Sequence, residues 1–316
     1  MRFYDDMSQT IGRTPLVRIN KLNPYPKQMI LAKIESFNPG GSVKDRVAKS
    51  MLDDAERQGL LVPGKVIIEP TSGNTGIGIA MLSALRGYRC ELVMPESMSI
   101  ERRKIMLAYG AKVTLTPAAD GTDGSREYVN RMLEEQPDRY ISLNQYDNPA
   151  NWQAHYQTTA LEILSDTDNK ITHFVAGLGT SGTLMGMSRA LKEKNPDIQV
   201  ISVESIGSSL IQGLRNLDNS QIPGIYDSSQ IDQRLHVNEL AADRTARSLG
   251  TEEGIFSGQS SGAALWGAIE VARELEEKGE KKSVIVVLLA DSGERYISGN
   301  LFSTISQPEV LSITAE

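Results

Sequence analysis

The chain has 316 residues, of which 40% are hydrophobic, 23% are charged and 5% are aromatic, and its net charge is -7. This length favours two domains or one large α/β unit, because single hydrophobic cores stop growing at roughly 250–300 residues. The sequence contains no apolar run long enough to span a bilayer and no long Lys/Arg run, so neither a membrane nor nucleic acid is expected as a partner.

Short apolar runs alternate with longer amphipathic segments along the chain. The apolar runs predict strands at residues 66–68, 92–94, 113–115, 174–176, 200–203 and 284–289. The amphipathic segments predict helices at residues 45–58, 76–85, 100–109, 127–135, 183–194, 241–249 and 262–278. Gly279 is expected to end the last of them. This alternation predicts an α/β fold with mostly parallel twisted sheets flanked by helices, and a turn-forming cluster at 148–151 predicts a domain boundary.

The few cysteines and histidines restrict the chemistry. The single cysteine, Cys90, excludes an intramolecular disulfide framework, and its apolar surroundings favour a buried structural thiol. The three histidines, His155, His173 and His236, lack the spacing of metal ligands, so no metal site is expected. Acids near Met1 occupy the place where a signal peptide would be basic, which predicts a cytoplasmic protein.

Lys44 follows a Pro-Gly-Gly bend at a predicted helix start. Ser42 and Asp45 fit the S-x-x-D variant of a capping box, which would put Lys44 in the first helical turn. The positive end of a helix disfavours a charged lysine, which suits an amine that acts as a nucleophile and proton shuttle. A lone lysine is more often a solvated charge, so its role depends on the motifs around it.

Three further strand-to-helix junctions are rich in small polar residues. The segments 71–76 and 177–183 offer backbone N–H groups and hydroxyls at a helix start, which suits a carboxylate at the first and a phosphate at the second. The second lacks the spacing of Walker A and Rossmann loops, and a plain glycine-rich turn remains its alternative. The hydroxyls of 258–263 either cap a helix or bind a cofactor atom. Two anion sites predict a phosphorylated cofactor and an acidic substrate.

Six motifs together closely resemble, in this order, the cysteine synthases, which are O-acetylserine sulfhydrylases of the fold-type II pyridoxal-phosphate family. They are N-P-G-G-S-V-K-D-R (38–46), T-S-G-N-T-G (71–76), N-Q-Y-D-N-P-A-N (144–151), G-T-S-G-T (179–183), E-G-I-F-S-G-Q-S-S-G-A (253–263) and D-S-G-E-R-Y (291–296). The resemblance implies a tryptophan synthase β-like fold. Its larger, phosphate-binding domain would comprise 1–37 and 152–316, and its smaller, mobile substrate-binding domain would comprise 38–151.

The resemblance also implies residue roles. Lys44 would hold pyridoxal 5'-phosphate as a Schiff base, Asn74 would bond the phenolic oxygen of the cofactor, and Ser260 would face its pyridine nitrogen. The phosphate would be held by Gly179, Thr180, Ser181, Gly182 and Thr183. The carboxylate of the amino-acid substrate would be held by Thr71, Ser72, Gly73, Thr75 and Gln145.

The implied reaction is replacement of the β-substituent of O-acetyl-L-serine or O-phospho-L-serine by sulfide, through an α-aminoacrylate, to give L-cysteine. A serine hydroxyl at the pyridine nitrogen makes the ring a weaker electron sink than a carboxylate would, which favours elimination over transamination. The stretches 213–218 and 222–227 resemble the B-type enzymes. In some of those, the arginine matching Arg215 recognises the phosphate of phosphoserine, but others carry it and use acetylserine, so both donors stay open.

Two classes of alternative also remain. The first keeps the fold and changes the reaction: a cystathionine β-synthase, a serine or threonine dehydratase, or a synthase of other β-substituted alanines. The second is a non-catalytic protein that senses a metabolite or binds an acetyltransferase, although loss of Lys44 would be its expected signature. The family implies a homodimer, with a sulfur-carrier protein or serine acetyltransferase as possible partners. The sulfur source and the role of the tail from Ser306 onward stay open.

Overall fold

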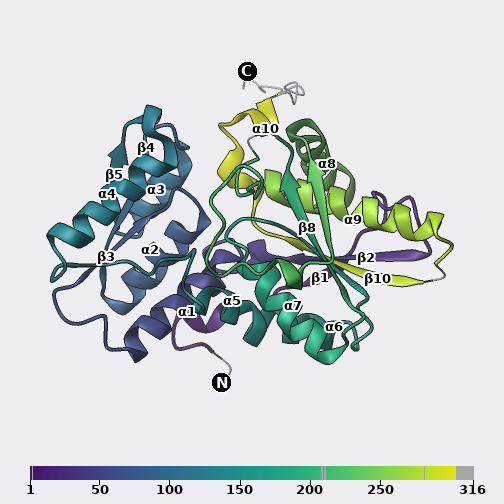
Figure 1. Cartoon of the computed structure of the whole chain (residues 1–316), viewed down its shortest axis with the longest axis horizontal. Coiled ribbons are helices and arrows are strands. Elements are labelled where there is room, and N and C mark those ends of the chain that lie inside the picture. Colours follow the sequence, from purple (N-terminus) through teal and green to yellow (C-terminus); the bar gives the residue numbers. More distant parts are fainter. Residues whose placement is uncertain (2, 208, 210, 281, 304–316) are drawn as a thin grey trace, which may run out of the picture.

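The computed structural model describes residues 1–303 except 2, 208, 210 and 281, so the tail from Ser306 lies outside the described residues. Two sheets form the frame, one on each side of the molecule in Figure 1. The larger has six strands in the order β1-β2-β10-β7-β8-β9, and only β1 runs antiparallel to its neighbour. Its strands are β1 (Leu16–Arg18), β2 (Gln28–Ile34), β7 (His173–Gly177), β8 (Gln199–Ser205), β9 (Gln233–Val237) and β10 (Ser283–Leu289).

The smaller sheet has four parallel strands in the order β5-β4-β3-β6. These are β3 (Val66–Pro70), β4 (Arg89–Pro95), β5 (Lys112–Thr116) and β6 (Tyr140–Ile141). The helices of this part are α1 (Lys44–Arg57), α2 (Asn74–Arg86), α3 (Ile100–Ala108) and α4 (Gly121–Glu135). Alternate residues of β3 enter different cores: Ile67 packs with α1 and α2, whereas Val66 and Ile68 pack with Val129 of α4.

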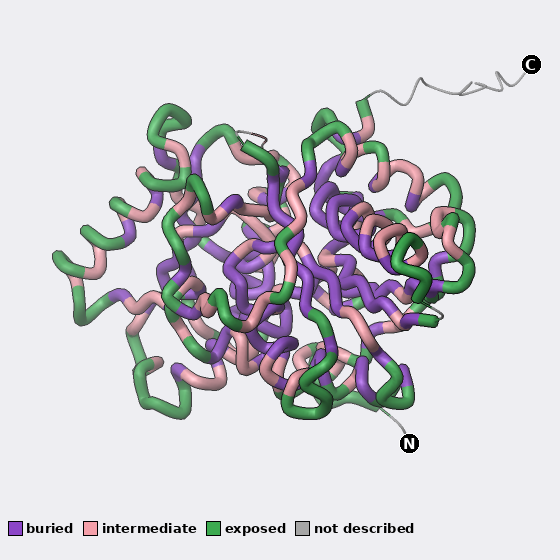
Figure 2. Tube along the Cα trace, turned by 45° about the vertical axis from the view of Figure 1, so that its right-hand side comes forward, coloured by how far each residue is buried: buried purple, intermediate pink, exposed green. Residues whose placement is uncertain are grey.

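Helices cover both faces of the six-stranded sheet. On one face, α8 (Glu239–Glu253) and α9 (Gln259–Glu277) pack over Val175 of β7; on the other, α6 (Ala160–Asp166) and α7 (Gly182–Lys194) pack over Phe174. The remaining helical segments are η1 (Met7–Thr10), η2 (Glu35–Phe37), η3 (Ala118–Asp120), α5 (Ala150–Ala154), the π-helical turn η4 (His155–Thr159), η5 (Ser228–Gln230), η6 (Gly293–Tyr296) and α10 (Asn300–Ser303). Figure 2 shows the buried residues along the strands and the facing helices, and the exposed ones in loops and outer turns.

The predicted α/β class with mostly parallel sheets is confirmed, and each predicted strand and helix is present. Gly279 follows the end of α9 with φ of +75°, as a C-terminal stop requires. The sequence reading missed four strands (β1, β2, β6 and β9) and the helical stretch 150–166. The strands of the four-stranded sheet lie within 38–151 and those of the other sheet outside that range, but the domain boundaries and the mobility of the smaller domain stay predictions. No helix in the described part of the chain is long and apolar enough to cross a membrane.

Candidate active site

Lys44 is the first residue of α1 and is partly buried. Desolvation lowers the pKa of its amine, although the charges of Asp291 and Glu35 oppose this effect. The predicted capping box was wrong in its detail. Ser42 Oγ accepts a bond from the N–H of Lys44 (3.2 Å), and the main contact of the Asp45 carboxylate is the N–H of Gly40 (2.6 Å), which the Pro-Gly-Gly bend carries to the helix start.

One pocket brings together Lys44, the glycine-rich segment after β7, and Ser260 in the first turn of α9. Its lining residues are Val43, Lys44, Ala176, Gly177, Gly179, Thr180, Ser181, Gly182, Thr183, Gly213, Leu214, Ser260, Leu288 and Ala290. The predicted cofactor residues other than Asn74 therefore share one cavity.

The segment between β7 and α7 forms a cradle for an anion. Ser181 precedes α7 with φ of +69°, and its buried Oγ has no hydrogen-bond partner within the described part of the chain. A Cβ on Gly179 would lie 2.9 Å from the Gly213 carbonyl oxygen, so the loop can close tightly only with glycine there. Unpaired N–H groups at the start of α7 and an unpaired buried hydroxyl fit a phosphate group.

His155 lies behind this cradle, in the π-helical turn. Its Nε2 is 3.3 Å from Thr183 Oγ1 and its Nδ1 is 3.0 Å from Thr159 Oγ1. Burial, together with the charges of Lys44 and Arg46, holds the pKa of His155 well below its usual value, so the imidazole is neutral. Sequence reasoning found no role for this residue. A π-turn often marks a functional site, but single residues do not reveal one in a sequence.

The second predicted cradle lies between β3 and α2. Thr71, Thr75 and Gln145 are buried, while Ser72 and Gly73 keep some solvent contact. Thr75 Oγ1 donates to Gln145 Oε1 (2.7 Å), so the structure brings the 71–75 segment and Gln145 together, as predicted for a carboxylate site. Their binding roles stay predictions.

Asn74 is held by side chains from the motif at 291–296, for which the sequence suggested no role. Its Nδ2 donates to Asp291 Oδ2 (2.7 Å), which also accepts from Tyr296 OH (2.8 Å). The Arg295 guanidinium donates to Asn74 Oδ1 and to the Gly40 carbonyl. Asp291 is only 1% exposed. This network fixes the amide of Asn74 relative to the loop that carries Lys44.

Arg215 lies beside the Lys44 pocket rather than in it, although the preceding residue, Leu214, lines that pocket. Its guanidinium stacks 4.4 Å from the centre of the Tyr146 ring and donates to the hydroxyl of Tyr146 (2.8 Å). Arg126 stacks on the same ring at 4.6 Å. Both arginines line a second pocket that abuts the predicted carboxylate site through Asn144.

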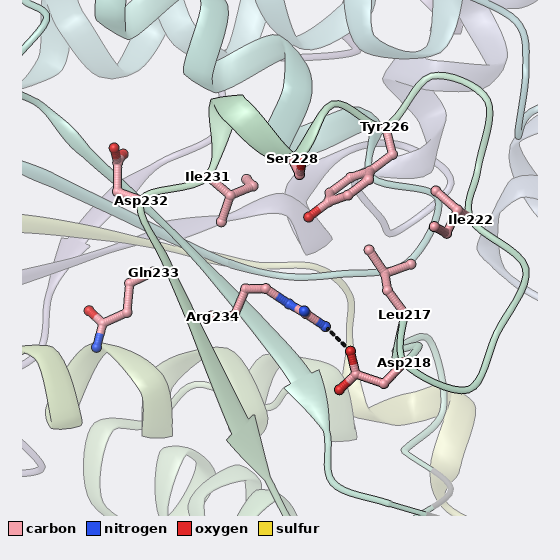
Figure 3. Close-up of a pocket in the computed structure, with 9 residues that line it drawn as sticks. All are labelled: Leu217, Asp218, Ile222, Tyr226, Ser228, Ile231, Asp232, Gln233 and Arg234. Carbon is pink, nitrogen blue, oxygen red and sulfur yellow. Dashed lines mark hydrogen bonds and ion pairs between the residues drawn. The ribbon is translucent and has the colours of Figure 1, made fainter.

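A further pocket, shown in Figure 3, contains none of the predicted site residues. Its lining is Leu217, Asp218, Ile222, Tyr226, Ser228, Ile231, Asp232, Gln233 and Arg234. Arg234 is paired with Asp218 (2.9 Å) and Glu204 (2.7 Å), and Asp232 is paired with Lys192 (2.8 Å). Its charged side chains thus neutralise one another, unlike the unpaired donors of the Lys44 pocket.

A lysine, an anion cradle and a hydroxyl in one cavity define a site suited to a phosphorylated aldehyde cofactor. The family model for pyridoxal-phosphate dependent enzymes matches residues 7–291, so the chain belongs to this family and is a pyridoxal-phosphate-dependent enzyme.

Within that family, its relatives include cysteine synthases. It is 50% identical to the cysteine synthase of Aquifex aeolicus, over 93% of this chain and 90% of that one, and 43% identical to cysteine synthase B of Salmonella typhimurium, over 94% and 95%. A crystal structure of an O-ureido-L-serine synthase, 40% identical, superposes with a TM-score of 0.91 and covers 98% of both chains.

Proposed function

We propose that the chain is a cysteine synthase, which replaces the β-substituent of an activated L-serine by sulfide to form L-cysteine. The observation that carries this proposal is the single pocket shared by Lys44, the 179–183 cradle and Ser260, in a chain 50% identical to a cysteine synthase. The predicted carboxylate site at 71–75 and Gln145 supports an amino-acid substrate.

The residues divide the work in the following way. The cofactor, when bound, supplies the electron sink for negative charge at the substrate α-carbon. The phosphate would be held by the N–H groups and hydroxyls of 179–183, and the substrate carboxylate by 71–75 with Gln145. Lys44 would take the α-proton while the β-substituent leaves, and its lowered pKa favours the neutral amine that this transfer needs. Ser260 would offer a neutral hydroxyl to the pyridine nitrogen, and Asn74 an amide to the phenolic oxygen.

Product analysis tests this assignment. The enzyme is supplied with O-acetyl-L-serine, O-phospho-L-serine or L-serine, each with sulfide or homocysteine, and products are identified by mass spectrometry. We expect cysteine from an activated serine and sulfide. Cystathionine, pyruvate or another β-substituted alanine as the main product would favour the alternative reactions, and absence of cysteine from both activated serines would overturn the proposal. A protein without cofactor absorbance would point to the non-catalytic sensor.

We propose O-acetyl-L-serine as the main donor, with O-phospho-L-serine as the second candidate. The second rests on Arg126 and Arg215, two guanidinium groups on one tyrosine ring beside the carboxylate site. If phosphoserine is a substrate, Arg215→Ala should lower kcat/KM on it by about tenfold or more, the effect of losing one charged hydrogen bond, and change that on acetylserine little. Arg131→Ala is the matched control, because Arg131 stacks on Tyr128 and lines neither pocket.

The remaining family properties belong to the same proposal. We propose a cytoplasmic homodimer that draws sulfur from free sulfide, thiosulfate or a sulfur-carrier protein, with that carrier or a serine acetyltransferase as its candidate protein partner. Light scattering on the purified protein measures the oligomer, and activity with each sulfur source separates the donors. A monomer would contradict the first of these statements.

A further inference from the structure

Asn151 is a buried amide that joins the two predicted cradles. It follows the 144–148 loop as the second residue of α5 and is only 1% exposed. Its Nδ2 donates to the main-chain carbonyl of Gln145 (2.6 Å) and to Thr180 Oγ1 (3.0 Å). One side chain therefore contacts the carboxylate cradle and the phosphate cradle at once.

The orientation of this amide follows from chemistry. A main-chain carbonyl such as that of Gln145 only accepts hydrogen bonds, so the amide nitrogen must face it. The amide oxygen then points at Gly182, where a built Cβ would lie 1.9 Å from it. This oxygen has no partner within the described residues. Two hydrogen bonds thus orient the Asn151 amide, and the position of its oxygen leaves no room for a side chain at Gly182.

The contact with Thr180 sets the direction of its hydroxyl. A hydroxyl has one hydrogen to donate and lone pairs that accept. Because Asn151 donates to Thr180 Oγ1, the lone pair on that side is occupied and the Thr180 hydrogen is free for another acceptor. An anion in the cradle is such an acceptor. The amide therefore keeps Thr180 as a donor toward the phosphate site.

At the other end, Gln145 is held by a second buried group. The Glu69 carboxylate, 1% exposed, accepts from the N–H groups of Leu143 (3.1 Å), Asn144 (3.2 Å) and Gln145 (3.2 Å). With Asn151 on its carbonyl and Thr75 on its Oε1, Gln145 is anchored at three points. Its side-chain Nε2 makes no hydrogen bond to another described residue and can donate to a carboxylate.

We infer that Asn151 is a positioning residue that couples the substrate-carboxylate loop to the phosphate cradle, by orienting Thr180 and anchoring Gln145. The inference rests on the proposed roles of those two residues. Substitution by aspartate keeps the shape and reverses the effect. The new carboxylate would accept the Thr180 hydrogen, would stand as a like charge beside the phosphate, and would lose the bond to the Gln145 carbonyl.

The test measures cofactor binding as well as catalysis. Wild type, Asn151→Asp and Asn151→Ala are compared by titration of the cofactor into the apoenzyme, by 31P NMR of the bound phosphate, and by steady-state kinetics on O-acetyl-L-serine. We expect Asn151→Asp to weaken cofactor binding by about tenfold or more, to shift the 31P resonance and to raise KM. Asn151→Ala, which adds no charge, should do the same to a smaller extent, and it carries the comparison if the aspartate variant does not fold.

Asn148→Asp is the matched control. Asn148 lies in the same loop and donates to the Leu143 carbonyl (2.9 Å), but it does not contact Thr180. This variant should leave cofactor affinity and the 31P resonance unchanged. Thr180→Val tests the site itself: no effect on cofactor affinity would refute the proposed phosphate site. An effect of Thr180→Val without one of Asn151→Asp would refute the coupling alone.

Discussion

Replacing Arg46 with methionine should destabilise the loop that carries Lys44. Arg46 is 3% exposed, and its guanidinium donates two hydrogen bonds to each of two carboxylates. Those to Glu35 are 2.7 and 2.9 Å long, and those to Glu162 are 2.6 and 2.8 Å long. Glu35 also accepts from Asn38 Nδ2 (2.8 Å), at the start of the Lys44 loop. The guanidinium thus neutralises two carboxylates and holds the loop against the rest of the fold.

The magnitude follows from what remains after the substitution. Glu162 keeps Lys33, whose Nζ is 3.0 Å away. Glu35 is fully buried, and among the described residues it keeps only neutral hydrogen-bond donors, Thr14 Oγ1 (2.7 Å) and Asn38 Nδ2 (2.8 Å). Removing one partner of a buried ion pair costs about 3–5 kcal/mol, because the other charge stays buried and unpaired. That is a large part of the roughly 5–15 kcal/mol by which folded proteins are stable. Most of the loss should therefore come from Glu35.

The assay is urea unfolding at pH 7, followed by circular dichroism and tryptophan fluorescence. The control removes the charge that Arg46→Met leaves unpaired: adding Glu35→Gln to the Arg46→Met variant should recover more than half of the lost stability. If Arg46→Met costs less than about 1 kcal/mol, or if the second substitution recovers nothing, the ion pair is not what holds this loop.

The pH dependence gives an independent check. Burial raises the pKa of Glu162, but the hydrogen bonds and charge of Arg46 outweigh this and lower it to about 2. A carboxyl with a lower pKa in the folded state stabilises the fold above its unfolded value of about 4.5 and loses this contribution as pH falls toward 2. The wild type should lose stability across that window, by about 2 kcal/mol after allowance for solvent screening, and Arg46→Met should lose less there.

Three further predictions concern the site and its supports. Lys44→Ala should abolish the absorbance of the cofactor linkage and nearly all cysteine formation, measured by spectroscopy and product assay; retention of both would remove Lys44 from the chemistry. His155→Gln should reduce the loss of stability as the pH falls below about 6.5, because the unfolded state takes up a proton there that the buried imidazole, with its lowered pKa, does not. Free energies of unfolding measured at pH values on both sides of 6.5 check this, and an unchanged loss in the variant would contradict it. Gly182→Ala should disrupt folding or cofactor binding, because its Cβ would meet Asn151 Oδ1. Gly250→Ala is the control: its Cβ would lie in open space on α8, so it should stabilise the fold by up to about 1 kcal/mol. Equal melting temperatures and equal cofactor affinities of the two variants would show that the close contact is irrelevant.

The parts of the fold that follow local rules could be predicted from the sequence. Strand β10 is an apolar run of residues 284–289, because it lies between β2 and β7 with helices on both faces. Strand β2 was not predicted from the sequence, because Lys33 interrupts its apolar pattern. Yet Lys33 is fully buried, bonded to the Thr14 carbonyl (2.6 Å) and paired with Glu162 and Asp166. Its two charged partners lie more than a hundred residues away along the chain, so no local stretch of sequence shows that a lysine can be buried there.

The candidate site divides in the same way. Motifs at single junctions, such as 71–76 and 179–183, could be read because glycine and hydroxyl residues between a strand and a helix have a local physical meaning. Residues that act across the fold could not. Asp291 accepts a hydrogen bond from Asn74, which lies 217 residues away in the sequence. In the sequence, Glu69 only marks the end of an apolar strand, and its role in binding three backbone N–H groups follows from the structure. Asn151 and Asp291 both lie in motifs that the sequence analysis recognised, but neither residue was given a role there.

The two sheets explain why the site needs both halves of the chain. Parallel strands present their carboxyl-terminal ends at one edge, where ligands of α/β proteins bind, and the two cradles follow β3 of one sheet and β7 of the other. Two side-chain bridges connect these edges: Asn74 to Asp291, and Asn151 to Thr180. Each bridge joins a residue of 38–151 to one of 152–316, so residues at the edge of each sheet are positioned by side chains from the other part of the chain.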